Sequence, residues 1–484
     1  MKGRHLMKTK DMSYYVKSLI GLVIMFGFQH LPPIGPLTPL GMQVTGIFIG
    51  LIYLCCVVDI IWPSMVGLIA LGMSDYCTVT EAISAGFGSE LVWMMLIILI
   101  LAEGISQSGL GEILARWIIT RKGLRNRPML FTFVYMVSFG VCALLISSNA
   151  SVILAWAIFY NIADMVGYKR GERYSTMMII GCFLSCIIYE GLFAFQSWWL
   201  VLAQTFKDMT GYGINYVTYF IIGFIIETLV NLLWLLAMKY VFKCDFEKLN
   251  GVDVEKLGGE EELKLNFQHK MLFFCFGLIV AYVLVTIVLP PEWPFVALLN
   301  QITQAGWFAL VLVLAMVVRY KEKPVLEFSK VASTGLSWSI LMMCAAIIPV
   351  ARALTSEGTG VTELLNNILS PLFSGMNPVV FLAAILILQM FLTNVGSNMA
   401  TGIVLMTVII PFVGNYYFSP SLVGMIIIFV ATMGFILPGS SGMAPYLYSN
   451  KWIEVKDIYK YGLFYCGLFF ISAFPVYLIA SFII

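Results

Sequence analysis

The chain has 484 residues, of which 60% are hydrophobic and only 11% charged, and its formal net charge is +2 at pH 7. A soluble domain carries about a quarter charged residues, so this composition excludes a soluble globular protein and indicates a polytopic membrane protein. The small net charge gives no reason to expect a nucleic-acid partner. No signal peptide is expected, because the basic start MKGRHLMKTK is not followed by a short apolar region with a cleavage site.

Apolar stretches of about 20 residues are the pattern of membrane-spanning helices. The fold class that we expect is an all-α polytopic membrane protein with about 11 transmembrane helices. Two further apolar stretches, 128–166 and 371–414, each turn around at a Ser-Asn pair, which predicts a re-entrant hairpin in each. In chain order the spans are predicted at 15–31, 41–58, 60–73, 91–118, 175–205, 217–241, 270–289, 304–319, 335–354, 421–448 and 462–484.

The two Ser-Asn pairs belong to an internal repeat. Ser148-Asn149 recurs as Ser397-Asn398, at an offset of 249 residues (397 − 148 = 249). Gly109 recurs as Gly358 at the same offset. A repeated polar pair in apolar surroundings is typical of a secondary transporter built from two inverted-topology repeats, with its binding site where the repeats meet.

Lys and Arg predict the orientation of the chain. If the N-terminus is cytoplasmic, every basic cluster falls on the cytoplasmic side, and the C-terminus lies outside. The first hairpin then opens from the cytoplasm and the second from outside. The domains predicted are a first inverted repeat at 1–241 with its N-terminal scaffold helices, a cytoplasmic linker at 242–269 and a second repeat at 270–484. The basic clusters lie at 2–10, 121–127, 169–173, 239–270, 319–330 and 451–460.

The hairpin tips are candidate binding sites. Broken backbone at mid-membrane depth is tolerated where it lines a cavity or binds a ligand. Hydroxyls, amides and freed carbonyls suit a hard cation such as Na⁺, and half-helix N-termini attract an anion. The alternative is two turns capped by Ser and Asn with no ligand. The stretch FILPGSSGMAP at 435–445 predicts a further break, because proline and paired glycine unwind a helix.

The repeat relates two pairs of positions that include charged residues. Gly439 in this break maps onto Glu190 (439 − 249 = 190), and an ionisable residue at mid-depth is a functional candidate. Glu190 binds a cation or carries a proton in this interpretation; the alternative is a hydrogen bond to a neighbouring helix. Glu103 and Arg352 share the same offset (352 − 103 = 249), and either meet near the symmetry axis or have separate local partners.

The stretch EAISAGFGSELVWMMLIILILAEGISQSGLGEILARWII at 81–119 and its counterpart at 337–369 resemble the divalent anion sodium symporter family of the ion transporter superfamily. The Ser-Asn pairs resemble the Ser-Asn-Thr motifs of that family. This resemblance implies a homodimer in which each protomer has a scaffold and a moving transport domain. It also implies elevator-type import or exchange of di- or tricarboxylates, usually coupled to Na⁺. We expect neither enzyme activity nor an organic cofactor. We expect the protein in a plasma membrane, specifically the inner membrane of a bacterium.

Individual residues match the family pattern unevenly. The resemblance implies a conventional cation site at Thr393, Ser397, Asn398 and Gly439. Our hypothesis for the first half, where the sequence departs from the family pattern, is an altered cation site at Ser148, Asn149, Glu190 and Gly191. Leu144 stands where the family usually has a hydroxyl, and Ala150 and Met399 stand where it has threonine. The substrate ligands expected are Ser148, Asn149, Ser151, Ser397, Asn398 and Thr401.

Other functions remain open at this point. A proton-coupled carrier or an anion exchanger of the same fold, with a less anionic substrate, fits a carboxylate at Glu190. A membrane-embedded enzyme needs a cluster of His, Asp or Cys at mid-depth, and the sequence shows none. A channel or receptor does not require two opposed hairpins with matching tips.

Overall fold

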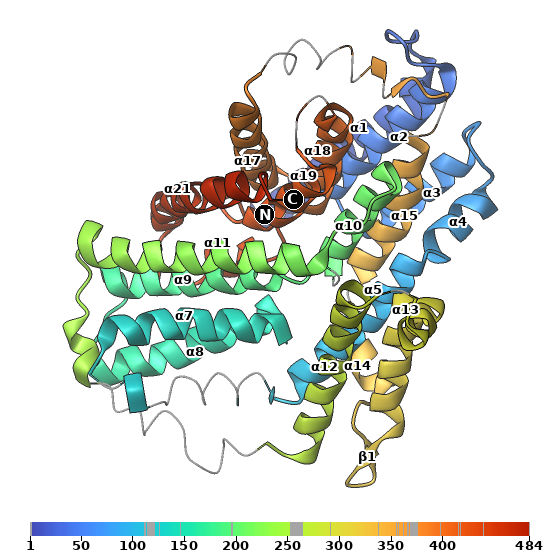
Figure 1. Cartoon of the computed structure of the whole chain (residues 1–484). Helices are drawn as coiled ribbons and strands as arrows, with labels where there is room; N and C mark the ends of the chain where they lie inside the picture. The colour runs from blue at the N-terminus through green and yellow to red at the C-terminus, as the bar shows by residue number, and fades with distance from the viewer. Residues whose placement is uncertain are drawn as a thin grey trace.

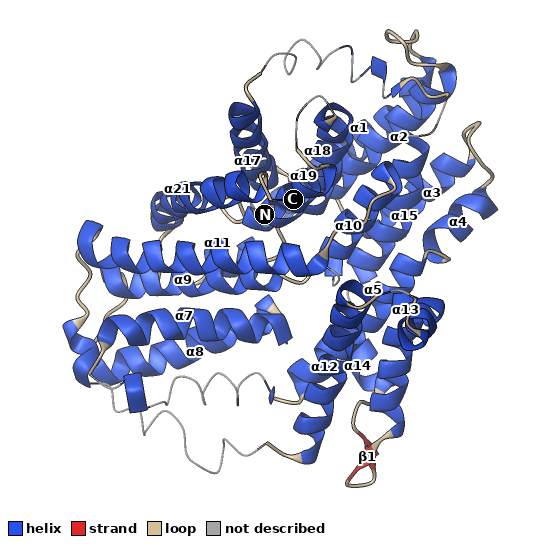
Figure 2. Cartoon of the chain, viewed as in Figure 1, coloured by secondary structure: helices blue, strands red, loops and turns tan. Residues whose placement is uncertain are grey.

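The computed structural model is almost entirely helical (Figure 2), with one short two-stranded hairpin, β1 (Arg319–Tyr320) and β2 (Lys323–Pro324), in the part that it describes. Nine of the described helices are long and apolar enough to cross a membrane, and shorter apolar helices accompany them. The described residues are 2–110, 113, 122–124, 126–145, 147–194, 197–251, 265–290, 292–336, 338–354, 356, 358–361, 363–364, 367, 376–396, 398–414, 416, 418–438 and 440–483.

Each predicted span overlaps helix in the described residues, which confirms the membrane-spanning fold class, but the span predicted at 421–448 is helical only to Met433 and again in α20 (Ala444–Ser449). The span predicted at 175–205 is two helices, because the chain leaves the helical conformation after Glu190. The helices are α1 (Lys2–Gly27), α2 (Pro39–Val57), α3 (Ile61–Gly72), α5 (Glu90–Gln107), α9 (Arg173–Glu190), α10 (Ser197–Thr210), α11 (Tyr216–Leu236), α12 (Phe267–Val288), α13 (Pro294–Val317), α15 (Trp338–Leu354), α19 (Pro420–Val430) and α21 (Val455–Ala480).

Several helix starts differ from the prediction, among them that of α1, which begins at Lys2 rather than at 15, and two of them have identifiable reasons. Helix α13 begins at Pro294 rather than at 304, and Thr303 inside it has a left-handed φ of 62°, so the predicted start marks a kink. Helix α21 begins at Val455 rather than at 462, because its first two turns are polar and follow a cap at Glu454. A search for apolar runs detects neither feature.

Two short helices, α4 (Val79–Phe87) and α14 (Phe328–Gly335), lie in no predicted span. Their first residues are 249 apart (328 − 79 = 249), so they extend the repeat. Gly109 and Gly358, which follow α5 and α15, both have positive φ, 78° and 86°. This conformation favours glycine and explains why the repeat keeps it at both positions.

Both Ser-Asn pairs lie at the junction of two helices. The first pair joins α7 (Pro128–Leu145) to α8 (Ser148–Val166), and the second joins α17 (Pro378–Val395) to α18 (Asn398–Val413). Ser147 caps α8, because its hydroxyl accepts a hydrogen bond from the Ala150 amide at 3.3 Å. The second arm of each hairpin therefore begins at the tip.

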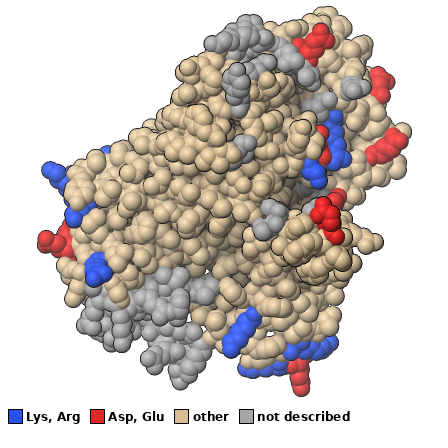
Figure 3. All heavy atoms as spheres, viewed as in Figure 1, with Lys and Arg blue, Asp and Glu red and all other residues tan. Residues whose placement is uncertain are grey.

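The helices form two groups (Figure 1). Helices α7, α8, α9 and α11 lie side by side and pack with α17–α19 and α21; we call this group the hairpin bundle. Helices α1–α5 and α12–α15 form the flanking bundle. Helix α10 contacts α18 and α19 on one side and α5 and α15 on the other. On the face shown in Figure 3, Lys and Arg gather mainly along the left and lower edges, and uncharged atoms cover the middle.

Candidate functional site

The second hairpin tip gathers oxygen atoms against a broken helix. Thr393, near the end of α17, is fully buried, and its Oγ1 lies 2.8 Å from both Asn398 Oδ1 and the Ala431 carbonyl oxygen. Ala431 belongs to η6 (Ala431–Met433), the short 3₁₀ helix that directly follows α19. One hydroxyl hydrogen cannot serve both acceptors fully. The cluster therefore has more oxygen lone pairs than hydrogens to fill them.

Gly434, directly after η6, lets the backbone approach this oxygen cluster. A Cβ atom on Gly434 would lie 1.9 Å from Asn398 Oδ1 and 2.8 Å from the Thr393 carbonyl oxygen, which is too close for any side chain. Because Gly434 has no side chain, the backbone leaves room for these two oxygens to lie beside it. Neutral oxygens of this kind, without a cluster of acids, suit a singly charged hard cation.

The first hairpin tip brings a carboxylate to its Ser-Asn pair. Glu190 is the last residue of α9, and Ser148 is the first residue of α8. Ser148 is 3% exposed and offers both its hydroxyl and its backbone N–H to the Glu190 carboxylate. The N-terminus of α8 adds the positive end of a helix dipole at the same point. The first site therefore contains a formal negative charge where the second has only neutral oxygens.

The two tips adjoin each other through the breaks that follow α9 and α19. A Cβ atom on Gly191 would lie 2.4 Å from Thr432 Cγ2, and Thr432 is the neighbour of Ala431 in η6. The Gly191 carbonyl oxygen accepts a hydrogen bond from the Tyr219 hydroxyl of α11 at 2.7 Å. The first break is therefore anchored on α11 and packed directly against the second site.

Comparison with known proteins identifies the family. Residues 12–480 match the family described as the sodium:sulfate symporter transmembrane region. The chain belongs to this family of transporters. It is accordingly a transporter and not an enzyme, which confirms both the expected resemblance and the expected class of protein.

Individual relatives of this symporter family member agree with its fold. The sodium-dependent dicarboxylate transporter SdcS of Staphylococcus saprophyticus subsp. saprophyticus is 22% identical over 94% of this chain and 90% of its own length. The Neisseria gonorrhoeae protein MtrF, described in terms of antimetabolite efflux pumps, has a TM-score of 0.57 at 13% identity, covering 96% of this chain and 98% of its own. The YdaH transporter of Alcanivorax borkumensis has a TM-score of 0.54 at 13% identity, covering 92% of this chain and 98% of its own. The two structures support the fold alone.

The remaining predicted site residues of this symporter chain have different surroundings. Asn149 is exposed at the first tip, whereas Ser151 is fully buried and its hydroxyl donates to the Phe139 carbonyl oxygen of α7 at 2.5 Å. The Thr401 hydroxyl donates to the Asn398 carbonyl oxygen at 3.2 Å. Ser397 and Gly439 lie outside the described residues.

One residue that the sequence reasoning missed is Asn394, directly after Thr393 in α17. Its amide donates to the carbonyl oxygens of Met390 at 2.8 Å and Met433 at 2.9 Å. Its Oδ1 accepts from the amides of Phe435 at 3.0 Å and Ile436 at 2.8 Å. Asn394 thus satisfies the backbone groups that the break after η6 releases. A further asparagine at the end of an apolar helix was the available signal.

Glu103 and Arg352, the opposite charges at the 249-residue offset, do not form an ion pair with each other in the described contacts. Glu103 Oε1 accepts a hydrogen bond from Gln107 at 2.8 Å, one turn along α5. Arg352 pairs with Asp208 of α10, at 2.8 Å from Nη2 to Oδ2. These contacts fit the alternative in which each charge has its own partner.

Proposed function

We propose that this transporter takes up a small organic anion, a di- or tricarboxylate, together with Na⁺. The oxygen cluster at Thr393, Asn398 and Ala431, held open by Gly434, is the observation that carries the proposal. A bound cation supplies the positive partner that these lone pairs lack. The family description and the printed name of the relative SdcS support sodium as the coupling ion and a dicarboxylate as the substrate class.

The anion in this proposal binds between the two tips. Helices α8 and α18 both begin at a tip, so their N-terminal N–H groups and dipoles favour a negative charge there. Ser148, Asn149, Ser397, Asn398 and Thr401 are the proposed side-chain ligands. Ser151, which is turned toward α7, positions the first tip instead.

Glu190 supplies the charge for a first cation site in this proposal, with Ser148, Asn149 and the Gly191 carbonyl as further ligands. An ionised glutamate beside a dianion is costly unless a cation lies between them. Na⁺ must therefore bind before the anion at this tip. A second cation at Thr393, Ser397, Asn398 and the Gly439 carbonyl completes the loading. This order couples the two solutes, because the anion binds only after the cations have offset the charge of Glu190.

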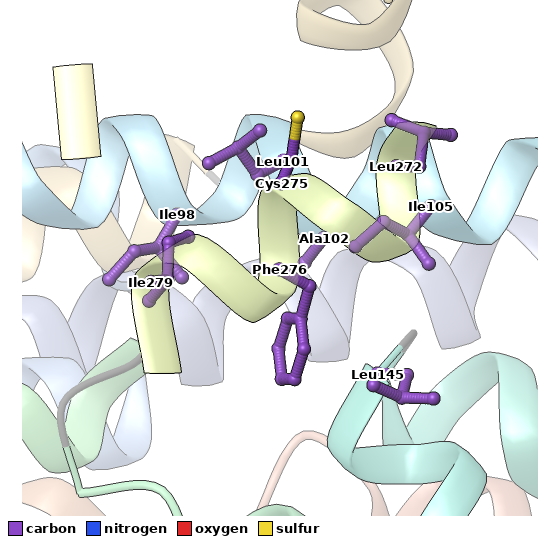
Figure 4. Close-up of a pocket in the computed structure, with 9 residues that line it drawn as sticks. All are labelled: Ile98, Leu101, Ala102, Ile105, Leu145, Leu272, Cys275, Phe276 and Ile279. Atoms are coloured by element: carbon purple, nitrogen blue, oxygen red, sulfur yellow. The ribbon is translucent and has the colours of Figure 1, made fainter. Parts of the chain in front are cut away.

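Movement of the hairpin bundle against the flanking bundle is the proposed transport step. A small apolar cavity of about 20 Å³ lies beside the first tip, between α5, α12 and the end of α7 (Figure 4). Leu145, at the end of α7, faces α5 and α12 across it. A contact without hydrogen bonds permits sliding at low cost. The lining residues are Ile98, Leu101, Ala102, Ile105, Leu145, Leu272, Cys275, Phe276 and Ile279.

The homodimer, the cytoplasmic N-terminus and the external C-terminus are parts of the same proposal. The basic clusters of the sequence and the position of Lys and Arg at the edges of the face in Figure 3 support the orientation.

Uptake into proteoliposomes tests the proposal. Succinate, citrate and sulfate are offered to wild type under an inward Na⁺ gradient or a matched K⁺ gradient. Thr393→Val removes the hydroxyl of the oxygen cluster. Thr286→Val is the matched control, since the described hydrogen bonds of the Thr286 hydroxyl stay within α12, to the Tyr282 and Val283 carbonyl oxygens. Na⁺-driven uptake of a carboxylate, lost in Thr393→Val and kept in Thr286→Val, is expected. Equal uptake under the Na⁺ and K⁺ gradients would exclude the proposed coupling.

A further inference from the structure

A second buried carboxylate lies inside the hairpin bundle, away from both tips. Glu227, in the middle of α11, is 0% exposed. Its Oε1 accepts a hydrogen bond from Asn231 Nδ2 at 2.7 Å, one turn along the same helix. Asn231 is equally buried and uses its other N–H toward Ser185 Oγ of α9, at 3.2 Å. Neither residue contacts the proposed ligands of the cation sites in the described structure.

Two oxygen atoms of this pair have no hydrogen-bond donor among the described residues. They are Glu227 Oε2 and Asn231 Oδ1. The Ser185 hydroxyl lies close to the Glu227 carboxylate, but it has one hydrogen, which donates to the Met136 carbonyl oxygen at 3.1 Å. One added hydrogen between these two oxygen atoms would satisfy both. The pair therefore corresponds to a carboxylic acid hydrogen-bonded to an amide, without the proton of the acid.

The groups that face Glu227 offer no positive charge to an ionised carboxylate. The titratable neighbours are Cys186 and Tyr189 of α9 and Tyr465 of α21, all neutral acids. An ionised carboxylate in such surroundings is strongly disfavoured, whereas a neutral one is tolerated once it is hydrogen-bonded.

The packing leaves little room for a metal ion. Beside the pair, helices α7 and α9 pack so closely that only glycine fits at position 140. A Cβ atom on Gly140 would lie 2.9 Å from Ser185 Oγ and 2.5 Å from Tyr189 Cδ2. On the next turn of α9, a Cβ atom on Gly181 would lie 2.5 Å from Trp234 Nε1 of α11. The smallest cation, a proton, fits this space without rearrangement.

We propose that Glu227 and Asn231 form a proton-binding site in the interior of the hairpin bundle. A proton from water binds Glu227 Oε2, and the resulting O–H donates to Asn231 Oδ1. With the existing Nδ2–H···Oε1 bond this closes a two-bond ring that fills both vacant acceptors. Loss of the proton places an unpaired charge between α9, α11 and α21, so alkaline pH loosens the bundle. The inference does not depend on the proposed Na⁺ sites.

Infrared spectroscopy of the purified protein tests the protonation directly. Glu227→Gln keeps one acceptor and one N–H donor, so it imitates the protonated residue. The spectrum of wild type minus that of Glu227→Gln at pH 7 should contain the C=O stretching band of a carboxylic acid. Only carboxylate bands in that difference would overturn the proposal, and so would an acid band that Na⁺ abolishes. Glu322→Gln, at an exposed turn, is the control and should give no acid band.

Thermal unfolding provides a second readout. Folded wild type keeps the proton, whereas an unfolded glutamate releases it above a pKa of about 4.3. Wild type therefore loses stability relative to Glu227→Gln as pH rises, by about tenfold in the unfolding constant per pH unit, until the folded form also ionises. Parallel pH profiles for the two proteins would overturn the proposal. Glu227→Met, which removes both bonds, should melt lower than Glu227→Gln at every pH.

Discussion

Arg352 of α15 and Asp208 of α10 join the two halves of the chain through one carboxylate oxygen. Arg352 Nε and Nη2 lie 2.9 and 2.8 Å from Asp208 Oδ2. Both side chains line a cavity between α10, α15 and α18, and Arg352 also lines a second cavity beside α4 and α5. The pair therefore fastens α10, which packs on the hairpin bundle, to a helix of the flanking bundle.

Breaking this ion pair should cost little stability. The two side chains are 45% and 24% exposed, and pairs in such positions contribute about 0–1 kcal/mol. Arg352→Gln and Asp208→Asn should each lower the free energy of unfolding by no more than that. The exchange of both charges, Arg352→Asp with Asp208→Arg, should recover most of the loss in a double-mutant cycle. A loss of several kcal/mol in either single variant would contradict the assignment of a solvent-screened pair.

Gly434→Ala should abolish the Na⁺ dependence of transport without removing any proposed ligand. The added methyl group would displace Asn398 Oδ1 and the Thr393 carbonyl, so the oxygen cluster could no longer form. Gly467→Ala on α21 is the matched control, because a Cβ atom there meets nothing within 4 Å. Na⁺-stimulated uptake and Na⁺-dependent thermal stabilisation are measured for both. Normal Na⁺ stabilisation in Gly434→Ala would exclude a cation site at this cluster.

Asn394→Ala should destabilise the protein through the break after η6. It leaves the Phe435 and Ile436 amides and the Met433 carbonyl without their partner, and a buried unpaired group costs about 1–3 kcal/mol. A loss of roughly 3 kcal/mol or more is expected. Asn377→Ala, which removes only an exposed cap from the Val379 amide, should cost about 1 kcal/mol. Equal melting temperatures for the two variants would show that Asn394 does not hold the break.

Glu190→Gln should weaken cation binding at the first tip. A unit charge about 4 Å from a cation contributes about 4 kcal/mol at an effective dielectric constant of 20. The Na⁺ concentration for half-maximal uptake should therefore rise at least about tenfold. Glu103→Gln, at a carboxylate that contacts Gln107 on α5, serves as the control. An unchanged Na⁺ dependence in Glu190→Gln would remove Glu190 from the cation site.

The sequence by itself determined the membrane-spanning class, the 249-residue repeat and the places where helices break. These features depend on local chemistry: the length of an apolar run, a proline, or a polar pair that lipid cannot solvate. The same reasoning missed α4 and the start of α21, because polar helical turns leave no apolar run.

Only the tertiary structure decided which polar groups meet. Glu190 faces Ser148 because α9 ends beside the start of α8, and Gly434 matters because Asn398 and Thr393 converge on it from another helix. Glu227 and Asn231 are visibly one turn apart in the sequence, yet their complete burial depends on α9 and α21. Hydrogen bonding and burial are properties of neighbours brought together by folding, and no local pattern in a single chain specifies those neighbours.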